Sequence, residues 1–372
     1  MLKVLFHIDT LSGGGAEKVL CTLVNHMNPK EFDITVQTIY PENAGEYLNN
    51  NIHYKYIYPK KNRFYGYLYR LEAALGLIYP LHMKADYDVE CAYLECGPTK
   101  VLASSTNKKA RKYAWVHCDL SAAYNRSFAE KTAKWYRKYD KVICVSEKIK
   151  ESFADYFGSG IPTEIIHNVV DSEEILRKSE LVPDKLKKTG ITMVNAARLT
   201  PPKNLLRLLK AQQKLLENGI DVNLWIVGEG EDRKKLEQFI AENDMGEQVT
   251  LWGYQQNPYP FMKAADLLVC SSNYEGFSTF VTEGLILGKP ILTTDCSGMK
   301  ELLGDSEYGI VTENSDEAFY NGLRSLLQNK DTMLPALEAA AQARGRAFTA
   351  ETLTRVNEEF LRKGTAGNGG NL

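Results

Sequence analysis

Short apolar runs alternate with longer amphipathic segments along the whole chain. The apolar runs have the composition of buried strands, and they fall at 3–8, 33–39, 89–94, 113–116, 142–145 and 164–167, then at 191–196, 222–227, 249–251, 267–270, 290–293 and 309–311. Amphipathic segments such as 16–27, 204–217 and 231–243 predict helices between them. This alternation predicts parallel sheets covered on both faces. We therefore expect an α/β protein with two doubly wound, Rossmann-like domains that face each other across a cleft.

A charged stretch with Pro183 and Gly190 interrupts the pattern between the two series. It predicts a first domain over 1–170, a linker over 171–190 and a second domain over 191–348. A C-terminal helix is expected over 349–363, packing back toward the first domain. The glycine-rich tail at 364–372 is expected to be disordered.

Composition narrows the possible functions. The 372 residues are 44% hydrophobic and 25% charged, with 45 basic against 47 acidic side chains, so nucleic-acid binding through bulk charge is not expected. No apolar run approaches the ~20 residues of a membrane-spanning helix. Seven dispersed cysteines without a CxxC pair predict reduced thiols in the cytoplasm, not a disulfide framework or a zinc site. Neither a metal nor another cofactor is expected, because there is no HExxH motif and no dense Asp, Glu and His cluster.

Charge is distributed unevenly along the chain. Residues 1–170 hold 22 basic and 18 acidic side chains, and residues 100–150 hold 13 and 4. Residues 55–70 carry five basic side chains and no acidic one, interleaved with tyrosines. The first domain is therefore expected to have local positive surface that the net charge of −2 conceals.

The loop after the first predicted strand has the sequence SGGGAE at 12–17. Gly14 and Gly15 would let backbone N–H groups approach a ligand oxygen at the start of a helix. A tight strand-to-helix turn explains the same residues equally well. The spacing is not GxGxxG, which argues against a nicotinamide or flavin dehydrogenase.

A second loop places Arg198 and Lys203 five residues apart, between a predicted strand and a predicted helix. A guanidinium and an ammonium at the end of a strand suit a diphosphate. Two solvated surface cations are an equally good interpretation of this segment alone.

The segment NYEGFSTFVTEG at 273–284 follows another predicted strand. Gly276 frees the backbone, and Ser278 and Thr279 supply hydroxyl groups and N–H donors at a helix start. Glu275 lies in the loop, and Glu283 lies two turns into the helix. A carboxylate at that position can accept hydrogen bonds from both hydroxyl groups of a ribose. Groups that donate hydrogen bonds to a phosphate, beside a carboxylate that accepts them from a diol, predict a nucleotide diphosphate site. The alternatives are a helix-dipole partner for Glu275 and a solvated face for Glu283, the second disfavoured by apolar neighbours.

In the first domain, His117 directly follows the predicted strand 113–116. Carboxyl ends of strands line the ligand cleft in doubly wound sheets, which favours a catalytic role, although a lone histidine is more often structural. A hydrolase that uses His117 and a nearby aspartate is disfavoured, because there is no GxSxG motif and no second clustered histidine.

Taken in order, these segments resemble the retaining glycosyltransferases of family 4, which have the GT-B fold. Glu275 and Glu283 match the E-x7-E motif of that family, and Arg198 with Lys203 matches its Gly-Arg-Leu…Lys segment. The glycine loop, HNVVD at 167–171, GEG at 228–230 and GY at 253–254 also match, so the resemblance covers nearly the whole chain. Ala197 and Val169 depart from it, where the family has glycine, without loss of a charged group.

The resemblance implies a role for each matched residue. Nucleotide-sugar donor contacts would come from Gly14, Gly15, Arg198, Lys203, Gly228, Tyr254, Glu275, Gly276, Phe277, Ser278, Thr279 and Glu283. Arg198 and Lys203 would neutralise the diphosphate, Glu283 would hold the ribose, and the backbone at Tyr254 would meet the nucleobase. His117 would lie beside the anomeric carbon, and Glu275 would position the sugar hydroxyls. The implied reaction transfers a sugar with retention of its anomeric configuration and without a metal. The expected donor is a UDP-sugar.

The expected acceptor is a saccharide linked to a lipid pyrophosphate, as used by many members that build bacterial capsule, exopolysaccharide or lipopolysaccharide. The basic residues of 100–150 would receive that pyrophosphate. Residues 55–80 place aromatic and leucine side chains beside basic ones, which suits an anionic membrane surface and predicts a cytoplasmic protein held peripherally on the inner face of the cell membrane. Alternatively, Leu68, Leu71, Leu75 and Ile78 pack on the first sheet.

Two rival functions fit the same fold. A nucleotide-sugar 2-epimerase would carry more acid–base residues than His117 alone. A non-catalytic nucleotide-sugar-binding subunit is disfavoured, because the charged residues that the family uses are all present.

Overall fold

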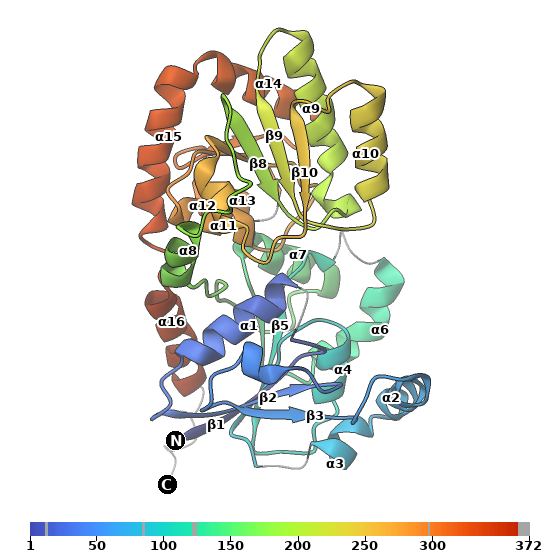
Figure 1. Ribbon diagram of the computed structural model, residues 1–372. Coiled ribbons are helices and arrows are strands. Elements are labelled where there is room, and N and C mark those ends of the chain that lie inside the picture. Colours follow the sequence, from blue (N-terminus) through green and yellow to red (C-terminus); the bar gives the residue numbers. More distant parts are fainter. Residues whose placement is uncertain (12–13, 84–85, 121–124, 297, 364–372) are drawn as a thin grey trace. The chain divides into compact units, whose positions relative to one another are not determined.

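The computed structural model describes residues 1–11, 14–83, 86–120, 125–296 and 298–363 (Figure 1). They form two compact units, unit 1 from Met1–Val170 together with the chain from Ala350 on, and unit 2 from Asp171–Thr349. The tail at 364–372 and the loop residues 12–13 lie outside the described residues. No described helix is long and apolar enough to cross a membrane.

The described part of unit 1 has a seven-stranded parallel sheet in the order β3-β2-β1-β4-β5-β6-β7. Its strands are β1 (Leu2–His7), β2 (Phe32–Thr38), β3 (His53–Tyr56), β4 (Val89–Ala92), β5 (Arg111–Val116), β6 (Lys141–Cys144) and β7 (Thr163–Ile165). The order reverses between β1 and β4, so the loops after these strands diverge at the carboxyl edge, where doubly wound sheets bind ligands.

Strand β3 is absent from the expectations drawn from the apolar runs. It is an edge strand that pairs with β2 only, and its four side chains are exposed or half-buried. It therefore lacks the buried apolar run by which the other strands could be predicted.

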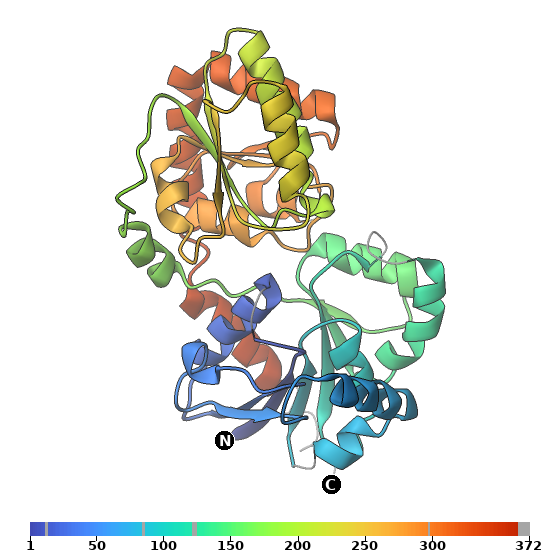
Figure 2. The ribbon, with the colours of Figure 1, turned by 45° about the vertical axis from the view of Figure 1, so that its right-hand side comes forward.

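Helices connect the strands of unit 1. They are α1 (Gly15–His26), the short 3-10 helix η1 (Ala44–Glu46), α2 (Arg63–Leu75), α3 (Ile78–His82), α4 (Gly97–Leu102), α6 (Arg126–Tyr136), α7 (Glu147–Phe157) and α16 (Ala350–Lys363). Figures 1 and 2 show α16, at the end of the described chain, beside α1. Glu358 of α16 accepts a hydrogen bond from the Asn28 N–H at 2.7 Å, and the ring of Phe360 lies 4.7 Å from that of Tyr113. These contacts complete the unit with residues distant in the sequence.

Unit 2 contains a six-stranded parallel sheet in the order β10-β9-β8-β11-β12-β13. The strands are β8 (Thr192–Ala196), β9 (Asn223–Val227), β10 (Val249–Gly253), β11 (Leu267–Cys270), β12 (Ile291–Thr294) and β13 (Ile310–Thr312). The helices are α8 (Ser172–Ser179), η2 (Pro201–Lys203), α9 (Leu205–Glu217), α10 (Arg233–Glu242), α11 (Tyr259–Ala264), α12 (Thr279–Ile286), α13 (Met299–Leu303), α14 (Asp316–Gln328) and α15 (Lys330–Gly345).

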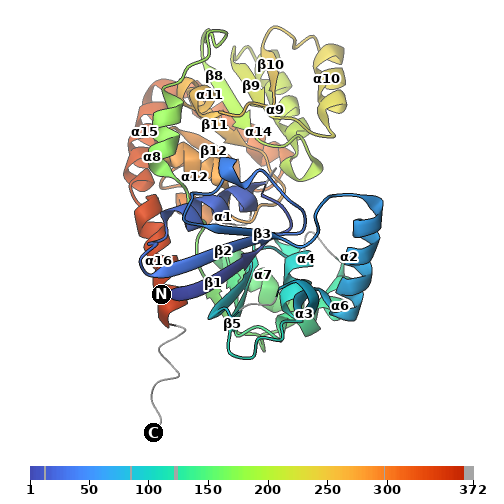
Figure 3. The ribbon, with the colours of Figure 1, turned by 60° about the horizontal axis from the view of Figure 1, so that its bottom comes forward.

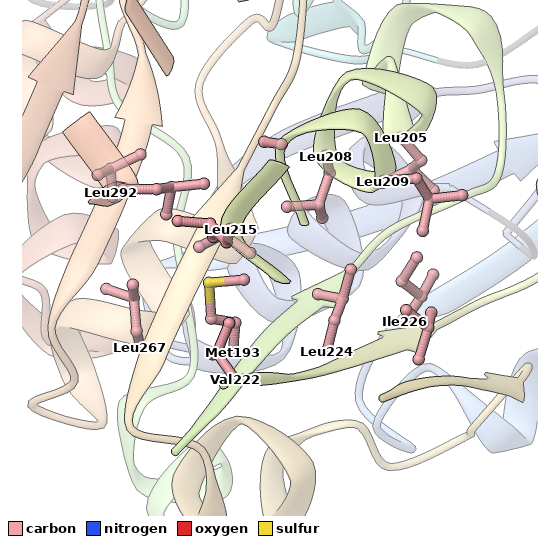
Figure 4. Packing of buried hydrophobic residues seen from close by; sticks show 14 of the residues in the cluster. Met193, Leu205, Leu208, Leu209, Leu215, Val222, Leu224, Ile226, Leu267 and Leu292 are labelled. Atoms are coloured by element: carbon pink, nitrogen blue, oxygen red, sulfur yellow. The ribbon is translucent and has the colours of Figure 1, made fainter. Parts of the chain in front are cut away.

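Helix α9 illustrates why the amphipathic segments fold as they do. Leu205, Leu208, Leu209 and Leu215 recur at helical spacing and are all buried. Figure 4 shows these leucines over Met193 of β8 and over Leu224 and Ile226 of β9. Their burial fixes the start of α9, and so the loop after β8, on the sheet.

The segment 171–190, expected to be a linker, contains helix α8. The Asp171 side chain accepts a hydrogen bond from the Glu174 N–H at 2.8 Å and so caps the helix. The helix contacts α11 and α12 of unit 2. With Ile175 as its one buried apolar residue, α8 was too short to stand out from the charged sequence around it.

Candidate functional site

Three loops of unit 2 leave the carboxyl ends of neighbouring strands. They follow β9, β8 and β11, which are adjacent in the sheet. The loop after β8 carries Arg198 and Lys203, the loop after β9 begins at Gly228, and the loop after β11 carries Glu275. The fold therefore brings the segments singled out in the sequence to one edge of one sheet.

The first two loops touch at Gly228. Its φ of 145° lies in the region that favours glycine, and a Cβ there would lie 1.9 Å from the carbonyl oxygen of Ala197. The Ala197 N–H in turn donates to the carbonyl of Val227 at 3.0 Å. Any side chain at position 228 would therefore push the loop that carries Arg198 away from β9.

Lys203 and Glu275 form an ion pair at this edge. The Nζ–Oε1 distance is 2.6 Å, and Ser272 Oγ donates to the same carboxylate oxygen at 2.7 Å. Burial lowers the pKa of Lys203, but the charge of Glu275 and the hydrogen bond to it raise this pKa more, so the net shift is upward. The lysine is firmly charged and can bind an anion. The expectation gave the two side chains separate partners in the donor, whereas the structure pairs them with each other.

Arg207 is a residue that the sequence reasoning missed. It is 7% exposed on α9, and it donates to Asp316 Oδ1 at 2.8 Å, to Asn314 Oδ1 at 2.7 Å and to the Ser271 carbonyl at 3.3 Å. It therefore anchors the start of the loop that carries Glu275. The sequence could have pointed to Arg207, because an arginine among the apolar positions of a predicted helix is unusual and needs polar partners.

Helix α12 begins directly after this loop. Ser278 is buried, and its Oγ accepts from the Val281 N–H at 3.4 Å, as an N-cap. Phe277 before it is also buried, while Thr279 and Gly276 are half-buried. The positive end of the helix therefore lies next to Glu275 and Lys203.

Glu283 is buried on α12, at 7% exposure, and its Oε1 accepts a hydrogen bond from Tyr259 at 3.1 Å. The alternative of a solvated face is wrong for this residue. Tyr259 supplies a polar partner that the sequence could not reveal, because it comes from α11.

Two of the expected donor contacts are exposed. Arg198 is exposed on its loop and has no ion-pair partner among the residues that the structure describes. Tyr254, after β10, is 73% exposed. Both are accessible to a ligand from solvent.

Unit 1 presents its expected site residues at the carboxyl edge of its own sheet. Gly14 precedes α1 and Gly15 is its first residue, after β1. His117 follows β5. Burial lowers the pKa of His117 to about 4, although the nearby Tyr93 carbonyl and Asn168 side chain favour the protonated ring and oppose this shift. The imidazole is therefore neutral at pH 7, and its two buried ring nitrogens have no hydrogen-bond partner among the described residues.

Glu95 holds His117 in place and was also missed. It follows β4, which lies between β1 and β5 in the sheet. Its Oε1 accepts from the N–H groups of both His117 and Cys118, the second at 2.9 Å. Burial raises the pKa of Glu95, against the effect of these N–H donors. The signal was its position directly after a predicted strand, the same argument that singled out His117.

Asp9 lies at the same edge, after β1. Burial and the charge of Glu17 raise the pKa of Asp9 to about 6. No group of three or more His, Cys, Asp or Glu side chains suited to a metal ion occurs within the described ranges.

A second surface of unit 1 carries an exposed apolar stripe along α2. Phe64 is 66% exposed, Tyr67 68%, Leu71 44% and Leu75 63%. Within α2, all of which is described, Glu72 alone is buried, where it accepts from Tyr58 at 2.7 Å. Packing on the sheet is therefore the wrong interpretation of Leu71 and Leu75. Leu68 is half-buried, and Ile78, in α3, is buried.

Two domain families together match most of the chain. "Glycosyltransferase Family 4" matches residues 13–174 and "Glycosyl transferases group 1" matches 177–344. The N-acetylgalactosamine-N,N'-diacetylbacillosaminyl-diphospho-undecaprenol 4-alpha-N-acetylgalactosaminyltransferase of Campylobacter jejuni is 28% identical over 97% of this chain and 100% of its own. The poly(ribitol-phosphate) alpha-N-acetylglucosaminyltransferase of Staphylococcus aureus is 22% identical over 84% of this chain and 67% of its own.

The fold is also similar to that of solved structures. Anabaena Alr3699/HepE in complex with UDP-glucose superposes with a TM-score of 0.78, at 19% identity, over 98% of this chain and 100% of its own. At this identity the similarity concerns the fold, two parallel Rossmann-like sheets, and no single residue.

Proposed function

Because the chain belongs to glycosyltransferase family 4 and has the GT-B fold, we propose that it transfers a sugar from a UDP-sugar to a lipid-linked saccharide, with retention at the anomeric carbon. The observation that carries the proposal is the charged edge of unit 2, where the Lys203–Glu275 pair lies beside the start of α12 and Arg198 is exposed on the loop of Lys203. It offers cations and N–H donors to a diphosphate beside carboxylates for hydroxyl groups.

In this proposal Arg198 and Lys203 neutralise the charge that grows on the diphosphate as the glycosidic bond breaks. Glu283 accepts from the ribose, and Glu275 orients the donor sugar. His117, neutral at pH 7, donates one hydrogen bond to the sugar near the anomeric carbon. The acceptor oxygen forms the new bond on the face from which the nucleotide leaves, and the leaving phosphate takes the acceptor proton. No metal takes part.

The choice of substrates is supported by relatives. UDP and UDP-glucose are bound in structures of the same fold, and the Campylobacter jejuni relative is named for a diphospho-undecaprenol acceptor and an alpha linkage. We extend this to an acceptor on a lipid diphosphate, in the synthesis of a bacterial surface polysaccharide. The exposed stripe of α2 beside Lys60, Lys61 and Arg63 supports contact of unit 1 with an anionic membrane.

The test is a panel of UDP-, GDP- and ADP-sugars, scored by thermal shift and by slow hydrolysis, followed by transfer to a polyprenyl-diphosphate saccharide. We expect the UDP-sugars to stabilise the protein and the product to keep the anomeric configuration, read from the coupling of its anomeric proton by NMR. An inverted product would refute retention. Isomerisation of the donor without acceptor would favour the 2-epimerase, and donor binding without hydrolysis or transfer would favour the binding subunit.

A further inference from the structure

A pocket of about 380 Å³ lies on the helical surface of unit 1. One wall is the end of α2 with Gly76, and the others come from α4 and α6, which Figure 3 shows in the same part of the unit. The lining residues are Ala73, Ala74, Leu75, Gly76, Lys100, Ala103, Ser104, Lys134, Trp135 and Lys138. Three of the ten are lysines, and none is acidic.

The three lysines have no compensating charge. Lys100, Lys134 and Lys138 make no ion pair with any described residue. Lys134 lies in the last turn of α6 and Lys138 in the turn that follows it, so both like charges face the same pocket. Lys100 Nζ lies 5.6 Å from the centre of the Trp135 ring, which partly stabilises one of the three cations. A bound anion would relieve the repulsion among all three.

The wall formed by the end of α2 is apolar. Leu75 lines the pocket and belongs to the exposed stripe of α2 with Phe64, Tyr67 and Leu71. An anion held by the lysines would therefore lie at the end of a surface suited to hydrocarbon. A phospholipid has an anionic phosphate and a hydrocarbon part in this same arrangement.

The pocket is remote from the expected reaction centre. Ser104 and Lys138 precede β5 and β6, so they lie toward the amino edge of the sheet, whereas His117 follows the carboxyl end of β5. A six-residue strand such as β5 separates these edges by ~20 Å. The ligand of the pocket is therefore not the sugar that reacts.

We propose that this pocket binds the phosphate of an anionic phospholipid headgroup and so fixes unit 1 on the membrane. The inference rests on the membrane contact proposed above and adds the site that selects the headgroup. It gives a role to three of the thirteen basic side chains of residues 100–150, which line one pocket next to α2.

The experiment compares the wild type with the triple variant Lys100→Gln, Lys134→Gln, Lys138→Gln on vesicles of phosphatidylglycerol and phosphatidylcholine. Each cation near a charged leaflet contributes about fivefold, so the triple variant should bind roughly a hundredfold more weakly. The matched control is Lys210→Gln, Lys234→Gln, Lys235→Gln, which removes the same charge from exposed positions of unit 2. This control should bind like the wild type.

Trp135 gives a readout of the pocket itself. Vesicles with phosphatidylglycerol should change the tryptophan emission of the wild type, and the change should be absent in Trp135→Phe and in the lysine variant. Equal loss of binding in both triple variants, or no binding of the wild type, would overturn the proposal. The same emission change with inorganic phosphate at matched ionic strength would overturn the assignment to a lipid. Hydrolysis of the UDP-sugar in solution reports the proposed enzyme separately, and it should be the same in all four proteins.

Discussion

The ammonium group of Lys203 lies 2.6 Å from a carboxylate oxygen of Glu275, although the two residues are on loops that follow different strands. The pair holds the lysine in one position before any ligand arrives. A diphosphate that binds Lys203 must share it with Glu275 or displace it. The two residues are therefore expected to act as a unit, and their substitutions to be non-additive.

Lys203→Ala and Glu283→Ala should each weaken binding of a UDP-sugar by about 2–5 kcal/mol, because each removes one partner of a desolvated ligand group. Titration calorimetry measures the loss, and circular dichroism checks that the fold persists. Lys210→Ala, an exposed lysine on α9, is the control and should bind normally. Unchanged affinity in both test variants would remove these residues from the donor site.

His117→Ala should lower kcat much more than donor affinity, because a group beside the anomeric carbon acts mainly in the transition state. Since burial lowers its pKa to about 4, the activity of the wild type should not follow titration of His117 between pH 6 and 8. Steady-state kinetics over this range test both points. Transfer at the wild-type rate in the variant would make His117 a structural residue.

Glu95 is expected to be a positioning residue for His117. Glu95→Ala removes the acceptor for two N–H groups and should lower kcat by up to about a hundredfold through misplacement of the imidazole. Glu95→Gln keeps an oxygen that can accept both hydrogen bonds, so its kcat should be close to that of the wild type. If Gln is as damaging as Ala, the carboxylate has a role other than accepting these two bonds.

His7 should make unit 1 less stable in acid. It is fully buried, with Nδ1 3.0 Å from the Gln37 carbonyl, and burial lowers its pKa to about 4 against about 6.5 when unfolded. The unfolded chain binds the proton more readily than the folded one. The contribution of His7 to the free energy of unfolding is therefore fully present above pH 6.5, and it falls toward pH 4 by about 1 kcal/mol per pH unit. His117 acts in the same direction.

Asp9 acts in the opposite direction, since its raised pKa of about 6 lets the folded state bind a proton first. The measurement is therefore a difference between urea unfolding of the wild type and of His7→Asn at pH 6 and pH 5. The variant keeps a donor near Nδ1 but does not titrate, so its stability should fall less. Parallel curves would show that His7 is not the group responsible.

The protein should co-sediment with anionic vesicles and not with neutral ones, because five basic side chains of residues 55–70 adjoin the exposed stripe of α2 in unit 1. Binding should weaken as salt shortens the Debye length, and Lys60→Ser, Lys61→Ser, Arg63→Ser should reduce it. Equal binding to neutral vesicles would indicate apolar insertion instead. Absence of binding to both would refute the membrane contact.

The strands of both sheets could be predicted because parallel strands are buried on both faces and read as apolar runs. Strand β3 could not, since an exposed edge strand has no such run. Helix α2 shows the converse limit. Leu68, Leu71 and Leu75 recur at helical spacing and do lie on one helix, but periodicity cannot say whether an apolar face meets a sheet or solvent.

The site divides in the same way. Arg198, Lys203 and Glu275 could be chosen because they follow predicted strands, and Glu283 because a carboxylate among apolar neighbours is unusual. Tyr259, which donates to Glu283, and Arg207, which holds Ser271 at the start of the loop that carries Glu275, could not be, since tertiary packing alone brings them to the site. Local sequence identified the groups, and tertiary structure determined what each one contacts.

The assignment of α16 to unit 1 has a consequence for synthesis on the ribosome. Helix α1 buries an apolar face, and α16, which packs on it, is translated only after residues 171–349. At ~5–20 residues per second, the nascent first unit waits on the order of 10–40 s for its last helix, while the second is already complete. During that interval the part of α1 that α16 covers in the finished protein is exposed, and we expect it to be available to a ribosome-associated chaperone. Slowing translation within unit 2 should therefore lengthen chaperone occupancy of unit 1 without any change in the finished protein.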